Sequence, residues 1–208
     1  MSEGAQMAGH LRAAFARRGE DSARARASRR AAPPVAAVLG SARSDGNTRA
    51  LVDAVFPRAS AARVIDLNDL AIGPYDYAHR HEADDFLPLL RSLAQARAVV
   101  FATPVYWYSM SGRMKTFFDR LTDATGPHKP LGRALAGRRA FALVTSASEE
   151  APPGFETPFA ETARYFAMRW GGMLHVRFGE DRRLAPEAQV RAAAFADRIA
   201  RALREDAA

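Results

Sequence analysis

The chain of 208 residues contains no cysteine. Disulfides, thiolate-bound metals, iron–sulfur clusters and a cysteine nucleophile are therefore excluded. The sequence also has no apolar run near the roughly 18 residues that a membrane span needs. What remains is a chain with 48% hydrophobic residues, a length and composition that fit one compact domain with a sizeable core.

The first 32 residues lack any strand-like run and are rich in alanine and arginine. They hold seven arginines and three acids, and so carry +4 of the formal charge of +7. The remaining charge is too small to indicate nucleic-acid binding, and no apolar region follows the arginines as in a secretory signal peptide. We expect residues 1–32 to be a flexible, solvated or partly helical extension, not a targeting or membrane-surface segment, and the folded domain to be residues 33–208 of a cytoplasmic protein.

Short apolar runs alternate with helical patterns after the prolines at 33 and 34. Strands are expected at residues 35–40, 63–67, 98–103, 139–145 and 173–178. Helices are expected around residues 51–56, 86–93, 114–121, 159–170 and 186–205. The first, third and fourth strands are almost wholly apolar, which is typical of strands buried on both faces of a parallel sheet. The pattern predicts an α/β fold, with ligands bound beyond the carboxyl ends of the strands.

The loop from Gly40 to Thr48 runs from the first strand directly into a helix. Its glycines allow close approach of the backbone to a ligand, and Arg43 offers a charged fork suited to phosphate. The start of the helix directs free N–H groups at the same point. Neutral donors are Ser41, Ser44, Asn47 and Thr48. The spacings of Walker A and dinucleotide loops are absent. We predict a terminal phosphate here; the alternative is that Asn47 and Thr48 only cap the helix.

The loop after the third strand carries three adjacent aromatic residues, Tyr106, Trp107 and Tyr108. A planar heterocycle needs flat apolar walls and a few backbone hydrogen bonds to its edge. Pro104 is expected to end the third strand, and small residues follow from Ser109. Another interpretation makes the aromatic residues a surface patch or an oligomer contact, and both roles can be shared among them.

Polar residues also follow the fourth strand. We expect Ser146 and Ser148 to reach the polar edge of the same ring, and Glu149 and Glu150 to be solvated. His79 and His81 stand beside acidic residues, but a solvated loop is favoured there over a metal site. Lys115 and Asp119 are spaced as a simple ion pair on a helix.

Together, the two main loops resemble the NADPH-dependent FMN reductase family of the flavodoxin-like superfamily. The first is similar in Gly40-Ser41-x-Arg43-x-x-Gly46-Asn47-Thr48. The second is similar in Thr103-Pro-x-Tyr106-Trp107-x-Ser109-x-Ser111-Gly112-x-x-Lys115, with Asp119-Arg120. The resemblance covers roughly residues 35–180.

The resemblance implies a three-layer flavodoxin-like sandwich with a five-stranded parallel sheet in the order 2-1-3-4-5. It implies non-covalent FMN, with the phosphate on Ser41, Arg43, Asn47 and Thr48. The isoalloxazine ring would lie on the backbone of Pro104, Val105, Tyr106, Trp107, Tyr108 and Ser109. A homodimer or homotetramer is the expected assembly. The iron–sulfur subgroup of the family is ruled out, because residues 72–81 contain no cysteine.

The implied activity is an FMN-dependent NAD(P)H oxidoreductase. Electrons from NADPH or NADH would pass through FMN to a small-molecule acceptor, such as a quinone, a free flavin, a nitro or azo compound or a metal oxyanion. No side-chain acid or base is required, so no catalytic residue is assigned. The alternative is a flavodoxin-type electron carrier, but such carriers are generally strongly acidic. A nucleic-acid-binding flavoprotein would depend on the arginine-rich extension alone.

Overall fold

The computed structural model describes residues 34–57, 60–179 and 183–206, so the expectations for residues 1–32 lie outside it. The strands are β1 (Val35–Leu39), β2 (Ala62–Asp66), β3 (Ala98–Tyr106), β4 (Ser109–Met110), β5 (Arg139–Ser146) and β6 (Arg169–Arg177). The α-helices are α2 (Asn47–Val55), α3 (Phe86–Gln95), α4 (Gly112–Arg120), α5 (Lys129–Arg133), α6 (Thr157–Tyr165) and α7 (Pro186–Glu205). Two 3-10 helices are η1 (Leu67–Asp69) and η2 (Leu121–Ala124).

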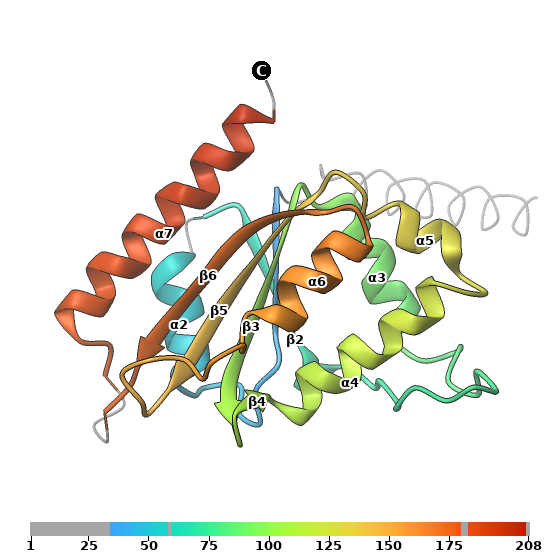
Figure 1. Ribbon diagram of the computed structural model, residues 1–208, viewed down its shortest axis with the longest axis horizontal. Helices are drawn as coiled ribbons and strands as arrows, with labels where there is room; N and C mark the ends of the chain where they lie inside the picture. The colour runs from blue at the N-terminus through green and yellow to red at the C-terminus, as the bar shows by residue number, and fades with distance from the viewer. Residues whose placement is uncertain (1–33, 58–59, 180–182, 207–208) are drawn as a thin grey trace, which may run out of the picture. The chain divides into compact units, whose positions relative to one another are not determined.

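The sheet has the order β2-β1-β3-β5-β6, and all these strands are parallel. The short β4 pairs antiparallel with the end of β3 and lies off this path. The five parallel strands thus follow the predicted order 2-1-3-4-5, and the α/β fold class is confirmed. All parallel strands end at the lower edge of the sheet as drawn in Figure 1.

Two cores lie on opposite faces of the sheet. On one face, α2 and α7 pack over Val35, Ala37 and Leu39 of β1; on the other, α3, α4 and α6 cover Ala36 and Val38 (Figure 1). This double burial explains why the central strands read as continuous apolar runs instead of alternating ones. Among the described residues, no helix is both long and apolar enough to cross a bilayer.

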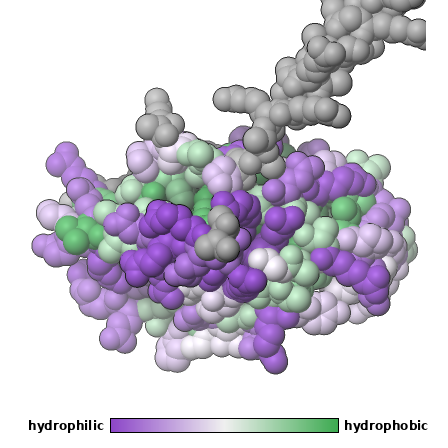
Figure 2. Space-filling model, turned by 90° about the horizontal axis from the view of Figure 1, so that it is seen from above, coloured by the Kyte–Doolittle hydropathy of each residue, from purple (hydrophilic) through white to green (hydrophobic). Residues whose placement is uncertain are grey.

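The edge of the sheet where the parallel strands begin lies opposite the edge where they end, and it is strongly polar. Figure 2 looks onto this edge and shows hydrophilic residues over much of it. Arg139 at the start of β5 donates through Nε and Nη2 to the Asp206 carboxylate, at 2.9 Å each, and Arg169 of β6 binds the same carboxylate. These bonds tie the end of α7 to the sheet, on the side away from the predicted ligand loops.

The prediction that Pro104 ends the third strand is wrong, because β3 continues to Tyr106 and Pro104 pairs with Thr145 of β5. The Ala102 carbonyl accepts the Gly40 N–H at 2.8 Å, so Ala102 directs its polar groups toward β1. Pro104, two residues later, faces the same side. There β1 has already ended at Leu39, so the missing N–H of proline costs no ladder bond.

The fourth predicted helix is also too long. Residues to Trp170 were assigned to its inner face, but α6 ends at Tyr165 and Trp170 belongs to β6. Ala167 adopts a φ of 54°, a left-handed conformation that stops the helix and is uncommon for a residue other than glycine. Strand β6 consequently starts four residues before the predicted start at 173.

A buried arginine holds the long loop between η1 and α3 against the domain. Arg120 is 1% exposed, and its Nε donates to Asp123 at 2.7 Å. Its Nη1 donates to Asp84 at 2.5 Å and to the Gly73 carbonyl at 3.1 Å, and its guanidinium stacks 4.8 Å from the centre of the Phe86 ring. Burial alone would raise the pKa of Asp84, but the hydrogen bonds from Arg120 hold that pKa below its usual range. The cluster therefore stabilises the fold at neutral pH, and this contribution is lost as the pH falls through the depressed pKa.

We expect Arg120→Ala to lower the free energy of unfolding by about 3–5 kcal/mol, because it leaves the buried Asp123 and the half-buried Asp84 without their shared cation. Urea denaturation followed by circular dichroism measures this loss. The matched control is Lys115→Ala on the same helix, whose exposed pair with Asp119 (2.5 Å) contributes less than about 0.5 kcal/mol. Equal losses in the two variants would contradict the role given to Arg120.

Candidate functional site

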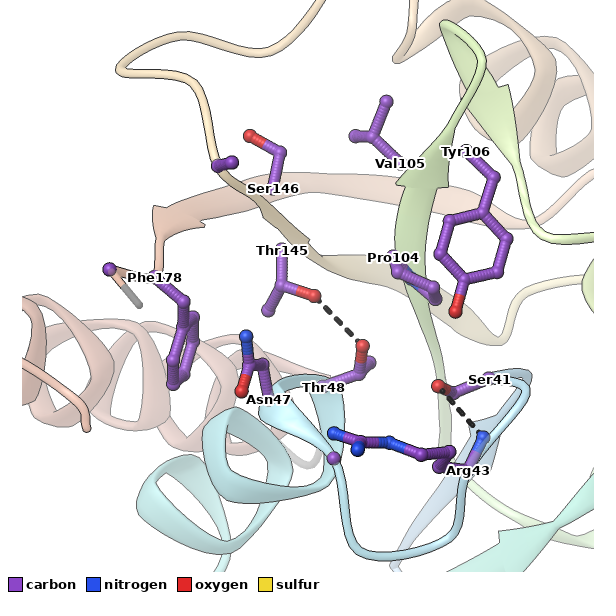
Figure 3. A pocket seen from close by; sticks show the side chains of 13 residues that line it. Ser41, Arg43, Asn47, Thr48, Pro104, Val105, Tyr106, Thr145, Ser146 and Phe178 are labelled. Carbon is purple, nitrogen blue, oxygen red and sulfur yellow. Dashed lines mark hydrogen bonds between the residues drawn. The ribbon is translucent and has the colours of Figure 1, made fainter. Parts of the chain in front are cut away.

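A cavity of about 480 Å³ lies at the edge where the parallel strands end. The loop after β1, the start of α2 and the carboxyl ends of β3 and β5 form it, together with the residues that follow β5 and β6 (Figure 3). Its lining residues are Ser41, Arg43, Gly46, Asn47, Thr48, Pro104, Val105, Tyr106, Thr145, Ser146, Ala147, Phe178 and Gly179. Parts of the chain more than 100 residues apart thus meet at one site, within the usual size range of small-molecule pockets.

One end of the cavity is formed by the loop after β1. Arg43, Asn47 and Thr48 surround the same space in Figure 3. The N-cap residue of α2 is Gly46, and no side chain caps the helix. Asn47 and Thr48 are the first two helical residues, so the interpretation of them as mere caps does not hold. The first turn of α2 therefore leaves backbone N–H groups available to an anion.

The same loop is held in shape by the end of β2. Asn68 donates through Nδ2 to the Ser41 carbonyl at 2.9 Å and to the Ser44 hydroxyl at 3.3 Å. The Asp66 carboxylate in turn accepts from the Asn68 backbone N–H at 2.8 Å and from its Nδ2 at 3.0 Å. The loop after β1 is thus fixed before any ligand arrives, which reduces the ordering cost of binding.

A pair of threonines joins this loop to the centre of the sheet. The hydroxyl oxygens of Thr48 in α2 and Thr145 in β5 lie 2.8 Å apart, and both residues are buried. Both line the cavity, and Figure 3 shows their bond at the side of it. Thr145 was not among the residues predicted for the site.

The end of β3 and the short β4 form a tight hairpin. Pro104, Val105 and Tyr106 line the cavity, whereas Trp107, Tyr108 and Ser109 do not. Tyr106 pairs with Ser109, which leaves Trp107 and Tyr108 as a two-residue turn. Their φ angles are 49° and 65°, and they are 93% and 79% exposed. Asn-Gly is usual at such a turn, so these two aromatic residues are held in a strained and solvated position.

Ser111 connects the hairpin to the loop after β1. Its hydroxyl donates to the Gly40 carbonyl at 2.5 Å and accepts the Met114 N–H at 3.2 Å, which caps α4. Its own N–H donates to the Thr103 hydroxyl at 3.0 Å. A side chain at position 40 would lie only 2.8 Å from the Met114 Cβ, so glycine allows the loop to approach the helix this closely.

The loop after β5 provides the third wall. Ser146 lines the cavity and its hydroxyl lies 2.8 Å from the His175 Nε2, while Ser148 donates its N–H to the Ser146 hydroxyl at 3.0 Å and does not line the cavity. Burial, and then the positive charge of Arg191, lower the pKa of His175. His175 is therefore neutral at physiological pH.

Besides Gly46 of the first loop, four residues that line the cavity were not predicted from the sequence: Thr145, Ala147, Phe178 and Gly179. Thr145 and Phe178 were assigned to strands, and only their position at a strand end signalled a role at the site.

The two histidines considered as metal ligands, His79 and His81, do not line the cavity. His79 bonds to Asp123 at 2.9 Å, and the ring of His81 packs against Gly73. No group of three or more metal-binding side chains occurs in the described part of the chain.

The sheet order, and the cavity beyond the ends of its strands, define a flavodoxin-like α/β protein. Solved structures of this class share the fold. The Trp repressor binding protein of Bacillus subtilis superposes with a TM-score of 0.62 and 21% identity, over 76% of this chain and 95% of that one. A flavodoxin, WrbA-like protein of Agrobacterium tumefaciens superposes with a TM-score of 0.56 and 16% identity, over 83% and 98%.

The family model of the NADPH-dependent FMN reductases matches residues 33–152, more than half of the chain. The chain therefore belongs to this family of flavin-dependent oxidoreductases, as the two loops predicted. YwqN of Bacillus subtilis (strain 168), described as an NAD(P)H-dependent FMN-containing oxidoreductase, is 34% identical over 92 residues. That match covers 41% of this chain and half of the length of YwqN.

The strained hairpin leads to a stability test. We expect the double variant Trp107→Asn/Tyr108→Gly to raise the free energy of unfolding by about 1–2 kcal/mol, because both new residues adopt positive φ readily. Thermal denaturation measures the gain. As a control, Tyr77→Asn removes another aromatic residue, one that is 90% exposed and outside the hairpin. A destabilised double variant would show that the aromatic side chains, and not the backbone, maintain the turn.

Proposed function

We propose that the protein is an FMN-dependent NAD(P)H oxidoreductase that delivers electrons from NADPH or NADH to a small-molecule acceptor. The observation that carries the proposal is one cavity that is lined by Arg43 and the start of α2 at one end and by the aromatic Tyr106 at another side. FMN has the corresponding chemistry, a phosphate at one end and a planar ring at the other. Membership of the family supports the same assignment.

The phosphate end fits a dianion in donor chemistry. Ser41, Arg43, Asn47 and Thr48 would hold the phosphate, together with the backbone N–H groups at the start of α2. Ser41 and Thr48 are 5% and 2% exposed, yet both residues line the cavity. Within the described residues the Ser41 hydroxyl donates to no acceptor and receives only the Arg43 N–H, at 3.5 Å. A phosphate oxygen would supply the acceptor that this buried hydroxyl lacks.

The ring end fits a flat heterocycle. Pro104, Val105 and Tyr106 would lie along one side of the isoalloxazine ring, with Ser146 and Ala147 along its other edge. The exposed Trp107 and Tyr108 extend this aromatic surface beyond the cavity, where an acceptor or a second subunit would meet them. Ser109 and Ser148 support these two loops through hydrogen bonds within them.

When bound, FMN supplies the redox chemistry by accepting two electrons from the nicotinamide and releasing them to the acceptor. The chain would bind and orient the FMN. The loop after β1 would anchor the phosphate, and the hairpin and the loop after β5 would limit the access of water to the ring. Quinones, free flavins, nitro or azo compounds and metal oxyanions are the proposed acceptors. Cytoplasmic location, assembly as a homodimer or homotetramer, and a folded domain at 33–208 stay predictions.

Removal of the phosphate contacts tests the binding end. We expect Arg43→Ala/Thr48→Ala to fold but to bind FMN about 100-fold more weakly, because a charged and a neutral hydrogen bond are lost. Fluorescence titration of the apoprotein with FMN measures the affinity. Arg49→Ala is the matched control, since Arg49 lies on the same helix and pairs with Asp53 at 2.9 Å on the surface. A double variant that keeps stoichiometric FMN would refute the phosphate assignment.

A second test separates an enzyme from an electron carrier. We expect NADPH or NADH to bleach the absorbance of the FMN-loaded protein without any added reductase, and menadione to restore it. Steady-state rates with both substrates varied should give the parallel lines of a ping-pong reaction. If the FMN is bleached only when a separate reductase is added, the protein is a carrier and the proposal fails.

A further inference from the structure

The threonine pair between α2 and β5 leaves one hydroxyl hydrogen unused. Thr48 and Thr145 each have one O–H group, and their oxygens lie 2.8 Å apart, so one hydroxyl donates to the other. Within the described residues, neither hydroxyl has any other hydrogen-bond partner. The pair is almost fully buried, at 2% and 3% exposure. A buried donor without an acceptor is costly, and the cavity is the space that both side chains line.

The direction of the bond decides which hydrogen remains. If Thr145 donates, the Thr48 hydroxyl keeps its hydrogen for the cavity, beside Arg43 and Asn47. Thr48 then accepts one bond and donates another, so its donor is polarised by the bond that it receives. An anion at the start of α2 favours this direction, because it needs donors and repels hydroxyl lone pairs.

From this geometry we propose that Thr145 is a positioning residue for phosphate recognition: it donates to Thr48 and so directs the Thr48 hydroxyl hydrogen at the phosphate monoester of the cofactor. The inference rests on the proposed function, since it assigns that phosphate to this end of the cavity. It also gives β5 a part in binding a group that the loop after β1 would otherwise hold alone.

The contribution of Thr145 to cofactor affinity depends on the phosphate, and this distinguishes it from a purely structural link between α2 and β5. A clamp between α2 and β5 would support the whole cavity, including the ring end at Tyr106 and Ser146. A positioning role affects only ligands that carry the phosphate. Riboflavin, which has the same ring without the phosphate, therefore separates the two.

The experiment compares Thr145→Val, which keeps the shape and removes the hydroxyl, with the conservative variant Thr145→Ser. We expect Thr145→Val to raise the Kd of FMN about five- to tenfold, as the loss of one organised hydrogen bond does. The Kd of riboflavin should stay unchanged, and Thr145→Ser should restore FMN binding. Fluorescence titrations of the apoproteins give both constants, and the ³¹P chemical shift of bound FMN should differ between wild type and Thr145→Val.

Two results would overturn the inference while the proposed function stands. One is wild-type affinity for FMN in Thr145→Val; the other is an equal loss of FMN and riboflavin binding, which would make the threonine pair a structural clamp. If the wild-type protein itself binds FMN no better than riboflavin, the phosphate assignment fails and the inference fails with it.

Discussion

The hydrogen bond from the Ser111 hydroxyl to the Gly40 carbonyl joins the two loops on which the site depends. One loop brings Ser41 and Arg43 to the cavity, and the other segment brings Tyr106. Ser111 also caps α4 through its hydroxyl and donates its backbone N–H to Thr103 of β3, so one residue connects the central strand, the helix and the loop after β1. The close approach that this bond requires is possible because residue 40 has no side chain.

The loop after β1 is held by hydrogen bonds, whereas the hairpin turn beside the cavity has a strained backbone. Asp66 and Asn68 hold the loop after β1 through hydrogen bonds on the side away from the cavity lining. At the front, Trp107 and Tyr108 occupy a turn that suits glycine and asparagine far better. Residues that are kept in strained and exposed positions beside a cavity indicate function, because stability alone would replace them.

Much of the fold could be predicted because the strongest patterns are local. The apolar runs of β1, β3 and β5 and the limits of α7 at Pro186 and Glu205 follow from burial and periodicity. The errors arose at residues whose conformation or contacts depend on segments that are distant in the sequence. Pro104 is tolerated in β3 because β1 ends at Leu39, and Thr145 meets the site through its hydrogen bond with Thr48, 97 residues earlier. The loop motifs identified Ser41, Arg43, Asn47 and Thr48, which do line the cavity, but no local pattern identifies Phe178 or Gly179 as part of its lining.

The exposed hairpin also provides an intrinsic fluorescence probe, because Trp107 lies at its tip. The chain has two tryptophans, and they report on different places. Trp107 stands 93% exposed at the tip, next to the cavity, whereas the Trp170 indole donates to Glu156 at 2.6 Å on the outermost strand. A molecule or subunit that covers the tip will shift the Trp107 emission to the blue and leave Trp170 as an internal reference, so the arrival of a partner can be followed without any label.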